Sequence, residues 1–74
     1  MARGKYDFSK LKGRIIEVFG TRKDFGKAME WSNVTITSRV NGASQWKQDE
    51  IDKAVELLHI DAAEIGDYFF RKVV

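Results

Sequence analysis

Apolar residues recur every three or four positions along most of the chain, which is the spacing of amphipathic helices. The pattern predicts helices over about 8–19, 22–29, 33–41, 47–59 and 62–68. Asp7 is placed to cap the first helix, and Gly20 is placed to end it. The β-branched run at 34–37 also suits a strand. However, the Asn41-Gly42 pair that follows favours a helix end.

The inward faces of these helices supply a candidate hydrophobic core. Its predicted members are Leu11, Ile15, Ile16, Val18, Phe19, Phe25, Ala28, Met29, Ile36, Val40, Ile51, Ala54, Val55 and Leu58. The sequence therefore predicts an all-α fold, a compact five-helix bundle formed by one domain over residues 1–74. Residues 1–6 are expected to form a flexible basic arm, and residues 69–74 a tail.

The middle of the chain, residues 21–42, has the spacing of a helix-turn-helix. Thr21 and Ser32 are placed to cap the two short helices. Gly26 occurs where the two helices would cross closely. In the turn, Trp31 is expected to fill the core rather than stack on a base. Trp46, after the second helix, is expected to pack against the bundle.

Composition excludes most catalytic and metal-binding classes. The chain has no cysteine and a single histidine, His59, so thiolate sites and Ser-His-Asp arrangements have no basis. We therefore expect a protein that is not an enzyme, with no metal, no cofactor and no catalytic residues. No apolar run approaches the length of a membrane span, and no stretch resembles a signal peptide. These absences predict a cytoplasmic protein without a membrane partner.

The net charge of +2 conceals an uneven distribution. Residues 1–23 hold seven basic and two acidic residues, a net charge of +5. Residues 24–42 are neutral, and residues 43–74 hold four basic and seven acidic residues, a net charge of −3. A basic part beside an acidic part indicates a polyanion bound on one side only. Chance asymmetry in a short chain is the alternative.

Several motifs resemble the Cro/repressor family of helix-turn-helix proteins from temperate phages, and more narrowly the small Cro-like proteins of phages that infect Gram-positive bacteria. The resemblance is carried by Tyr6-Asp7-Phe8-Ser9-Lys10-Leu11, by Val34-Thr35-Ile36-Thr37-Ser38-Arg39-Val40-Asn41-Gly42, by Trp46-Lys47-Gln48 before Glu50-Ile51, and by Tyr68-Phe69-Phe70. It covers nearly the whole chain. It implies a lambda-repressor-like DNA-binding domain that regulates transcription at a switch between lysis and lysogeny.

In such a domain the second helix of the motif lies in the major groove of an operator in double-stranded DNA. Its first residues project toward base edges, where Asn33 can pair with adenine and Val34 can pack on a thymine methyl group. The start of the preceding helix suits a phosphate. The predicted DNA contacts are Thr21, Arg22, Lys23, Asn33, Val34, Thr35, Thr37, Ser38, Arg39, Asn41, Ser44 and Lys47. In the arm, Arg3 and Lys5 are expected to add non-specific attraction.

Three departures from the family's pattern favour a second hypothesis. Glu30 stands where the family usually has a glycine with a left-handed backbone, and Arg22 stands where a glutamine is frequent. The second helix of the motif, at 33–41, contains no lysine or glutamine, and Arg39 is its only arginine. In some phages of this group a similar Cro-like protein modulates repression by pairing with the phage repressor. The surface predicted for that role comprises Glu30, Asn33, Val34, Thr37, Ser38 and Arg39.

The three consecutive aromatic residues near the end of the chain suggest an interface, because they cannot all face one core. Tyr68, Phe69 and Phe70 are therefore candidate contacts of a homodimer, whose two-fold symmetry would match a palindromic operator. The alternative is that the tail wraps around its own core.

Overall fold

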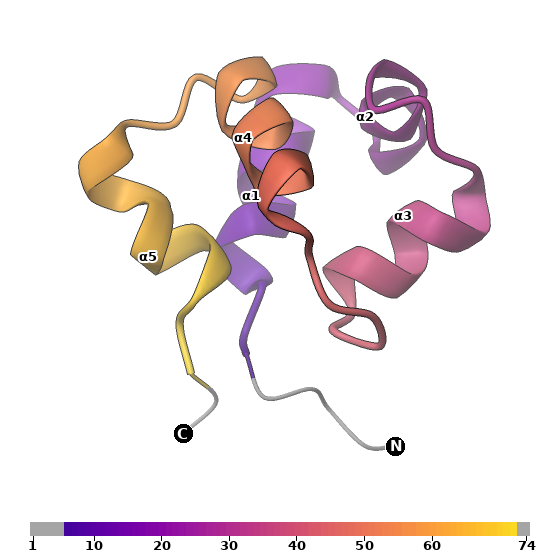
Figure 1. The fold of residues 1–74 in the computed structure, drawn as a ribbon. Helices are drawn as coiled ribbons and strands as arrows, with labels where there is room; N and C mark the ends of the chain where they lie inside the picture. Colours follow the sequence, from indigo (N-terminus) through magenta and orange to yellow (C-terminus); the bar gives the residue numbers. More distant parts are fainter. Residues whose placement is uncertain (1–5, 73–74) are drawn as a thin grey trace.

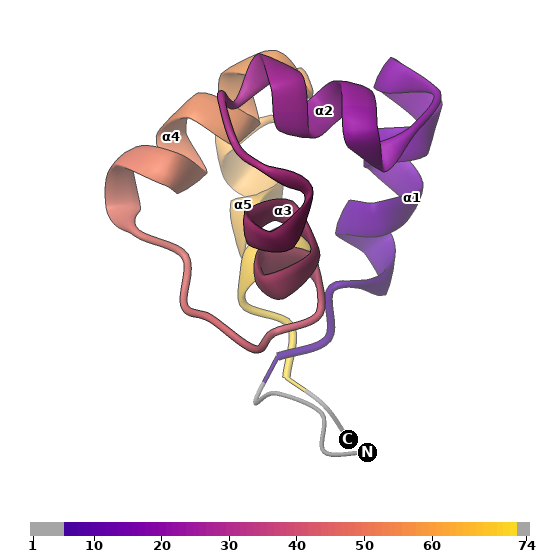
Figure 2. The same ribbon diagram turned by 90° about the vertical axis from the view of Figure 1, so that its right-hand side faces the viewer.

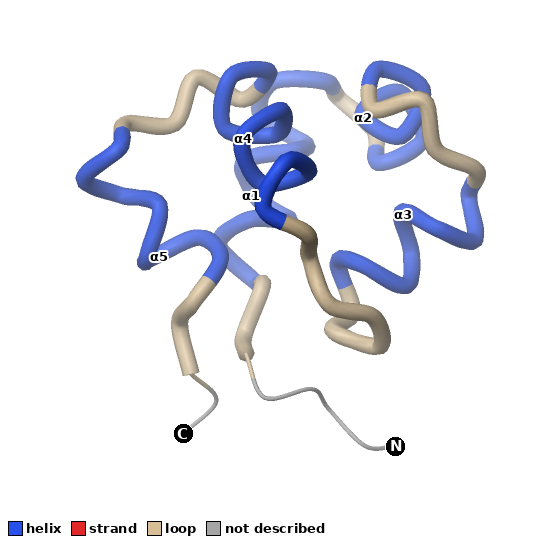
Figure 3. Tube along the Cα trace, in the orientation of Figure 1, coloured by secondary structure: helices blue, strands red, loops and turns tan. Residues whose placement is uncertain are grey.

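The computed structural model describes residues 6–72. Its helices are α1 (Ser9–Phe19), α2 (Arg22–Ala28), α3 (Asn33–Val40), α4 (Gln48–Leu57) and α5 (Ile65–Phe69), with a 3₁₀ turn, η1 (Ala62–Glu64), before α5 (Figure 1). Figure 3 shows helices and loops and no strand within the described residues. The predicted all-α bundle of five helices is confirmed, and the β-branched run at 34–37 is helical. In the same described part, no helix has both the length and the apolar character to cross a membrane.

The boundaries of the two middle helices follow from local hydrogen bonds. The Thr21 hydroxyl oxygen accepts the backbone N–H of Asp24 at 3.1 Å, and the Ser32 hydroxyl oxygen accepts that of Thr35 at 3.3 Å. Both residues satisfy donors that the first turn of a helix leaves free. Gly20 ends α1 with a φ of 85°, a conformation that glycine adopts without steric cost. The predicted caps at Thr21 and Ser32 and the predicted helix end at Gly20 are therefore confirmed.

The two ends of the described chain meet at Tyr6, the last residue of the predicted arm over residues 1–6. Tyr6 forms an antiparallel bridge with Lys72, and the Asp7 N–H donates to the Arg71 carbonyl at 2.6 Å. The Asp7 carboxylate accepts the N–H of Ser9, but α1 begins at Ser9 and its N-cap is Phe8, so the prediction of Asp7 as the cap was wrong by one residue. The remainder of the predicted arm, with Arg3 and Lys5, lies outside the described residues, as do 73–74 of the predicted tail.

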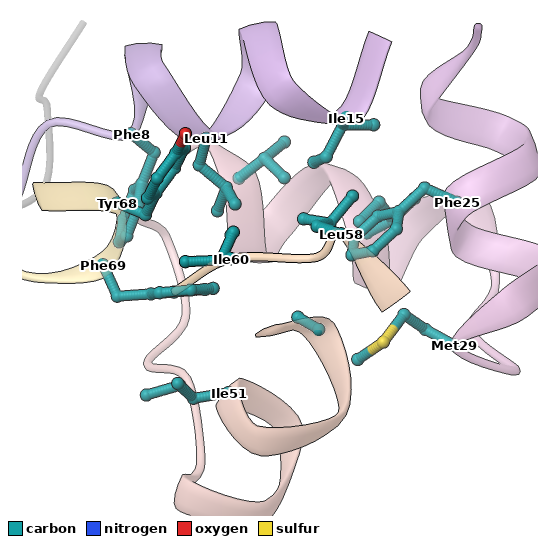
Figure 4. Close-up of a cluster of buried hydrophobic side chains, with 13 residues drawn as sticks. Phe8, Leu11, Ile15, Phe25, Met29, Ile51, Leu58, Ile60, Tyr68 and Phe69 are labelled. Carbon is teal, nitrogen blue, oxygen red and sulfur yellow. The ribbon is translucent and has the colours of Figure 1, made fainter. Parts of the chain in front are cut away.

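The core lies between α1, α4, α5 and the α2–α3 pair (Figure 4). Its buried members are Phe8, Leu11, Ile15, Phe25, Met29, Ile36, Val40, Ile51, Ala54, Leu58, Ile60, Tyr68 and Phe69. One prediction about burial was wrong. Ile16 is 53% exposed, because α1 buries the face that carries Leu11 and Ile15 instead. Tyr68 and Phe69 are core residues, because α5 packs against α1.

A close crossing sets the position of α3 relative to α2. Gly26 is buried, and a Cβ atom at this position would lie 3.3 Å from Cγ2 of Ile36. An added Cβ would require the Ile36 side chain to move by a few tenths of an ångström, and a larger side chain would need more room, so the small residue predicted at this crossing fits the packing.

The turn between α2 and α3 contains a strained residue. Glu30 has a φ of 63°, in the left-handed region that disfavours L-residues with a side chain. Its carboxylate forms an ion pair with Lys53 of α4 at 3.2 Å, which ties the turn to the fourth helix. The steric cost predicted for Glu30 is therefore present.

Replacing Glu30 with glycine is expected to give a more stable protein than replacing it with alanine, by about 1 kcal/mol. Both changes remove the ion pair with Lys53, so their difference reports on the backbone alone. Alanine retains the clash of a Cβ atom in the left-handed conformation, whereas glycine does not. Urea denaturation of both variants measures the difference. An alanine variant equal to or more stable than the glycine variant would contradict the argument.

Candidate interaction surface on α3

Helix α3 presents one bare face to the exterior. In Figure 2 it lies in front of the other helices, with none between it and the viewer. Ile36 and Val40 are each 1% exposed and fix the inward face at a spacing of four residues. The outward face consequently carries Asn33, Val34, Thr37 and Asn41.

This outward face is uncharged and carries one large apolar side chain. Val34 is 80% exposed, the most exposed large hydrophobic residue in the described part of the chain. A shallow hollow of about 420 Å³ runs along the helix, and it is lined by Asn33, Val34, Thr37, Ser38, Asn41 and Ala43. None of these lining side chains is ionisable. We call these six residues the α3 face.

The only arginine of α3 points away from the α3 face toward α4. Arg39 forms a two-pronged ion pair with Glu50, in which Nε donates to Oε1 and Nη2 donates to Oε2, each at 3.0 Å. Each of the two side chains is only 15% exposed. Planar, bidentate pairing of this kind uses the N–H donors of the guanidinium that would otherwise bind a phosphate or a guanine.

The ion pair perturbs both partners. The hydrogen bond from Arg39 lowers the pKa of Glu50 below its usual value, although burial acts against the shift, and the Lys47 N–H bonded to the carboxylate adds to it. The same hydrogen bond raises the pKa of Arg39. At neutral pH both groups are charged, so the pair is intact under physiological conditions.

Two tryptophans contact Arg39. The Arg39 guanidinium lies 5.4 Å from the centre of the Trp31 ring, and the Trp46 indole N–H donates to the Arg39 carbonyl at 3.1 Å. The two indole rings are 5.3 Å apart. We call Trp31, Arg39, Trp46 and Glu50 the Arg39 clamp. The clamp fastens α3 to the start of α4, and it confirms that both tryptophans pack against the bundle.

The remaining predicted contacts fall into two groups. Thr21, Thr35, Ser38 and Ser44 have structural roles: Thr21 caps α2, the Thr35 hydroxyl bonds with that of Ser32, and the hydroxyls of Ser38 and Ser44 bond to each other. Glu30 is tied to Lys53 in the turn. Arg22, Lys23 and Lys47 are exposed, and among the described residues none of them forms an ion pair.

The structure changes the candidate dimer contacts. Tyr68 and Phe69 are 9% and 2% exposed and are unavailable to a second chain, so their assignment as dimer contacts was wrong. Phe70 is 50% exposed and stays available.

Sequence reasoning missed Glu50, the residue that withdraws Arg39 from the α3 face. The two residues are eleven positions apart on different helices, and no periodicity connects them. The residues that line the hollow were found, except Ala43, because their helical spacing is visible in the sequence. Within residues 6–72 there is no group of three or more histidine, cysteine or acidic residues arranged to hold a metal ion.

Comparison with known proteins finds matches among protein families and among solved structures. A family model described as "Protein of unknown function (DUF739)" matches residues 4–72. Among solved structures, the chain is similar to the solution structure of the modulator of repression (MOR) of the temperate bacteriophage TP901-1 from Lactococcus lactis. The two chains are 42% identical, the alignment covers 89% of each, and the TM-score is 0.75. No curated protein matches the chain.

Proposed function

The chain belongs to the family described as "Protein of unknown function (DUF739)", and we propose that it is a phage regulator that modulates repression by binding the phage repressor through the α3 face. The similarity to a phage modulator of repression supports the class of function. The composition of the α3 face supports the mode of action.

The observation that carries the proposal is the chemistry of the α3 face. Specific binding to DNA depends on cations that reach phosphates and on side chains that read bases, above all arginine and lysine at guanine. The α3 face holds neither, because Arg39 is committed to Glu50. An exposed valine surrounded by neutral polar groups is instead typical of the centre of a protein interface, where charged residues are depleted.

Operator DNA is the second candidate partner. Arg22 and Lys23 at the start of α2 form no ion pair within residues 6–72, and together with the exposed amide of Asn33 they favour it. Two cations release few counterions, so such binding would be weak at physiological salt. A bound repressor would raise the effective concentration of this weak binder at DNA.

The proposal is tested by isothermal titration of the chain with the full-length repressor of the same phage, and with operator DNA at low salt. We expect a complex with the repressor at micromolar or lower concentration, and binding to DNA that is weaker and disappears as salt is added. Light scattering gives the stoichiometry. No complex with the repressor at micromolar concentration, combined with tight binding to DNA, would replace the proposal with the second candidate.

A further inference from the structure

An aromatic groove adjoins the α3 face. It has a volume of about 500 Å³ and is lined by Tyr6, Phe8, Gly42, Ala43, Ser44, Gln45, Trp46, Phe69 and Phe70. These residues come from three segments: the start of the described chain, the loop between α3 and α4, and the end of α5. None of the lining side chains is charged. We call this feature the aromatic groove.

The walls of the aromatic groove are held in place by contacts within the chain. On one side the rings of Tyr6 and Phe70 meet edge to face, with centres 5.9 Å apart. On the other side Trp46 and Phe69 meet in the same manner at 5.0 Å. A groove built before binding avoids much of the entropic cost of ordering side chains at an interface.

The loop that separates the aromatic groove from the α3 face is also fixed. The backbone N–H groups of Ala43 and Ser44 both donate to the Ser38 carbonyl, at 3.0 and 3.3 Å. Ala43 lines the aromatic groove and the hollow of the α3 face at once. The two features therefore meet at Ala43, and a partner that covers the α3 face lies next to the groove.

Charges around the groove indicate the chemistry of what it receives. Lys47 directly follows Trp46, Arg71 directly follows Phe70, and both are exposed. Neither forms an ion pair among the described residues. The one described acid that adjoins the lining in sequence, Asp7, has its carboxylate bonded to Ser9. Two cations and one carboxylate thus adjoin the lining in sequence, a net charge of +1, and the lining side chains themselves are uncharged.

From this adjacency and charge we infer that the aromatic groove is a second part of the repressor-binding surface, and that it receives a large apolar side chain next to an acidic residue of the repressor. The inference rests on the proposed function, since it takes the α3 face as the first part. Phe70, half exposed and at the wall of the groove, is the residue that the incoming side chain contacts. A buried aromatic anchor of this kind commonly dominates the affinity of an interface.

The test compares variants of the full chain in titrations with the full-length repressor. Phe70→Ser is expected to weaken binding about tenfold, because it removes the apolar wall. Gln45→Glu keeps the shape of the side chain but adds a negative charge to the groove. It is also expected to weaken binding, because the charge repels the acidic residue of the repressor. Gln45 lines the groove and not the α3 face, and its substitution leaves the core untouched.

Ile16→Ser is the matched control. Ile16 is 53% exposed and lines a separate hollow with Lys12 and Arg22, so this variant is expected to bind as the wild type does. Thermal melting followed by circular dichroism verifies the fold of each variant. If Phe70→Ser fails to fold, Gln45→Glu alone decides the outcome.

The outcomes separate the two proposals. If the wild-type chain binds no repressor, the proposed function fails. If the wild type binds, and Phe70→Ser and Gln45→Glu bind equally well, only the role of the groove is overturned. Light scattering of the wild type and of each variant without repressor tests whether the groove instead binds a second copy of this chain. A change in self-association with unchanged affinity for the repressor would assign the groove to a second copy of this chain and overturn the inference.

Discussion

Replacing Val34 with aspartate is expected to weaken binding of the phage repressor at least about 30-fold, equivalent to about 2 kcal/mol. Val34 lines the hollow of the α3 face and is 80% exposed, so the free chain gains nothing from its apolar surface. A bound partner would bury that surface. Aspartate at this position would place a charge in the interface, and the lining of the α3 face offers no cation to pair with it.

The fold is expected to tolerate this change, because the Val34 side chain makes no contribution to the core. Ile16→Asp is the matched control, since Ile16 is also an exposed aliphatic residue but lies on α1, where Lys12 and Arg22 can accommodate the charge. Isothermal titration with the repressor measures both variants. An affinity for Val34→Asp within twofold of the wild type would remove α3 from the interface.

Replacing Glu50 with glutamine is expected to lower the free energy of unfolding by about 2 kcal/mol at neutral pH. Glutamine can still accept the N–H of Lys47 through its oxygen, as the Glu50 carboxylate does at 2.9 Å. It cannot pair both donors of Arg39, and the largely buried guanidinium then loses its counter-ion. For a domain of this size the change corresponds to a decrease of about 8–16 °C in melting temperature.

The effect of this substitution is expected to depend on pH. Because the pKa of Glu50 is lowered in the folded state, its ion pair adds stability above the ordinary carboxyl pKa of 4.5, and that contribution is lost as the pH falls through the lowered value. The gap in stability between the wild type and Glu50→Gln should therefore be full at pH 7 and narrow as the pH falls well below 4.5.

Glu56→Gln provides the control for this experiment. Glu56 lies on the same helix, is exposed, and forms no ion pair among the described residues. Its substitution is expected to change stability by less than about 0.5 kcal/mol at any pH. Denaturation in urea between pH 7 and a pH well below 4.5 gives the free energy of unfolding of the wild type, Glu50→Gln and Glu56→Gln as a function of pH. A gap between the wild type and Glu50→Gln that stays constant with pH would show that the charge of Glu50 has no role.

The Arg39 clamp also links stability to the proposed function. It holds α3 against the start of α4 and keeps Arg39 away from the outward face. Loss of Glu50 would free the guanidinium to contact a phosphate. Glu50→Gln should consequently bind DNA more tightly than the wild type at low salt, even though it is less stable.

The sequence by itself determined the helices, because their signals are local. Apolar residues at a spacing of three and four positions identified the buried face of each helix, and Thr21, Ser32 and Gly20 marked their ends. Gly26 marked the crossing of α2 and α3, since only a small residue allows such an approach. The outward residues of α3 followed from the same periodicity, so most of the α3 face was predictable.

Only the tertiary structure decided which charged and aromatic side chains are free. Arg39 was a candidate for DNA in the sequence, but packing brings Glu50 within 3.0 Å of it. Tyr68 and Phe69 are buried because α5, which carries them, packs against α1, whereas Phe70 beside them is half exposed. Helical periodicity indicates whether a residue faces the core or the solvent, but it does not identify the distant segment that packs against that residue. The pairing of remote segments, which made the Arg39 clamp and the aromatic groove, depends on how the helices pack together.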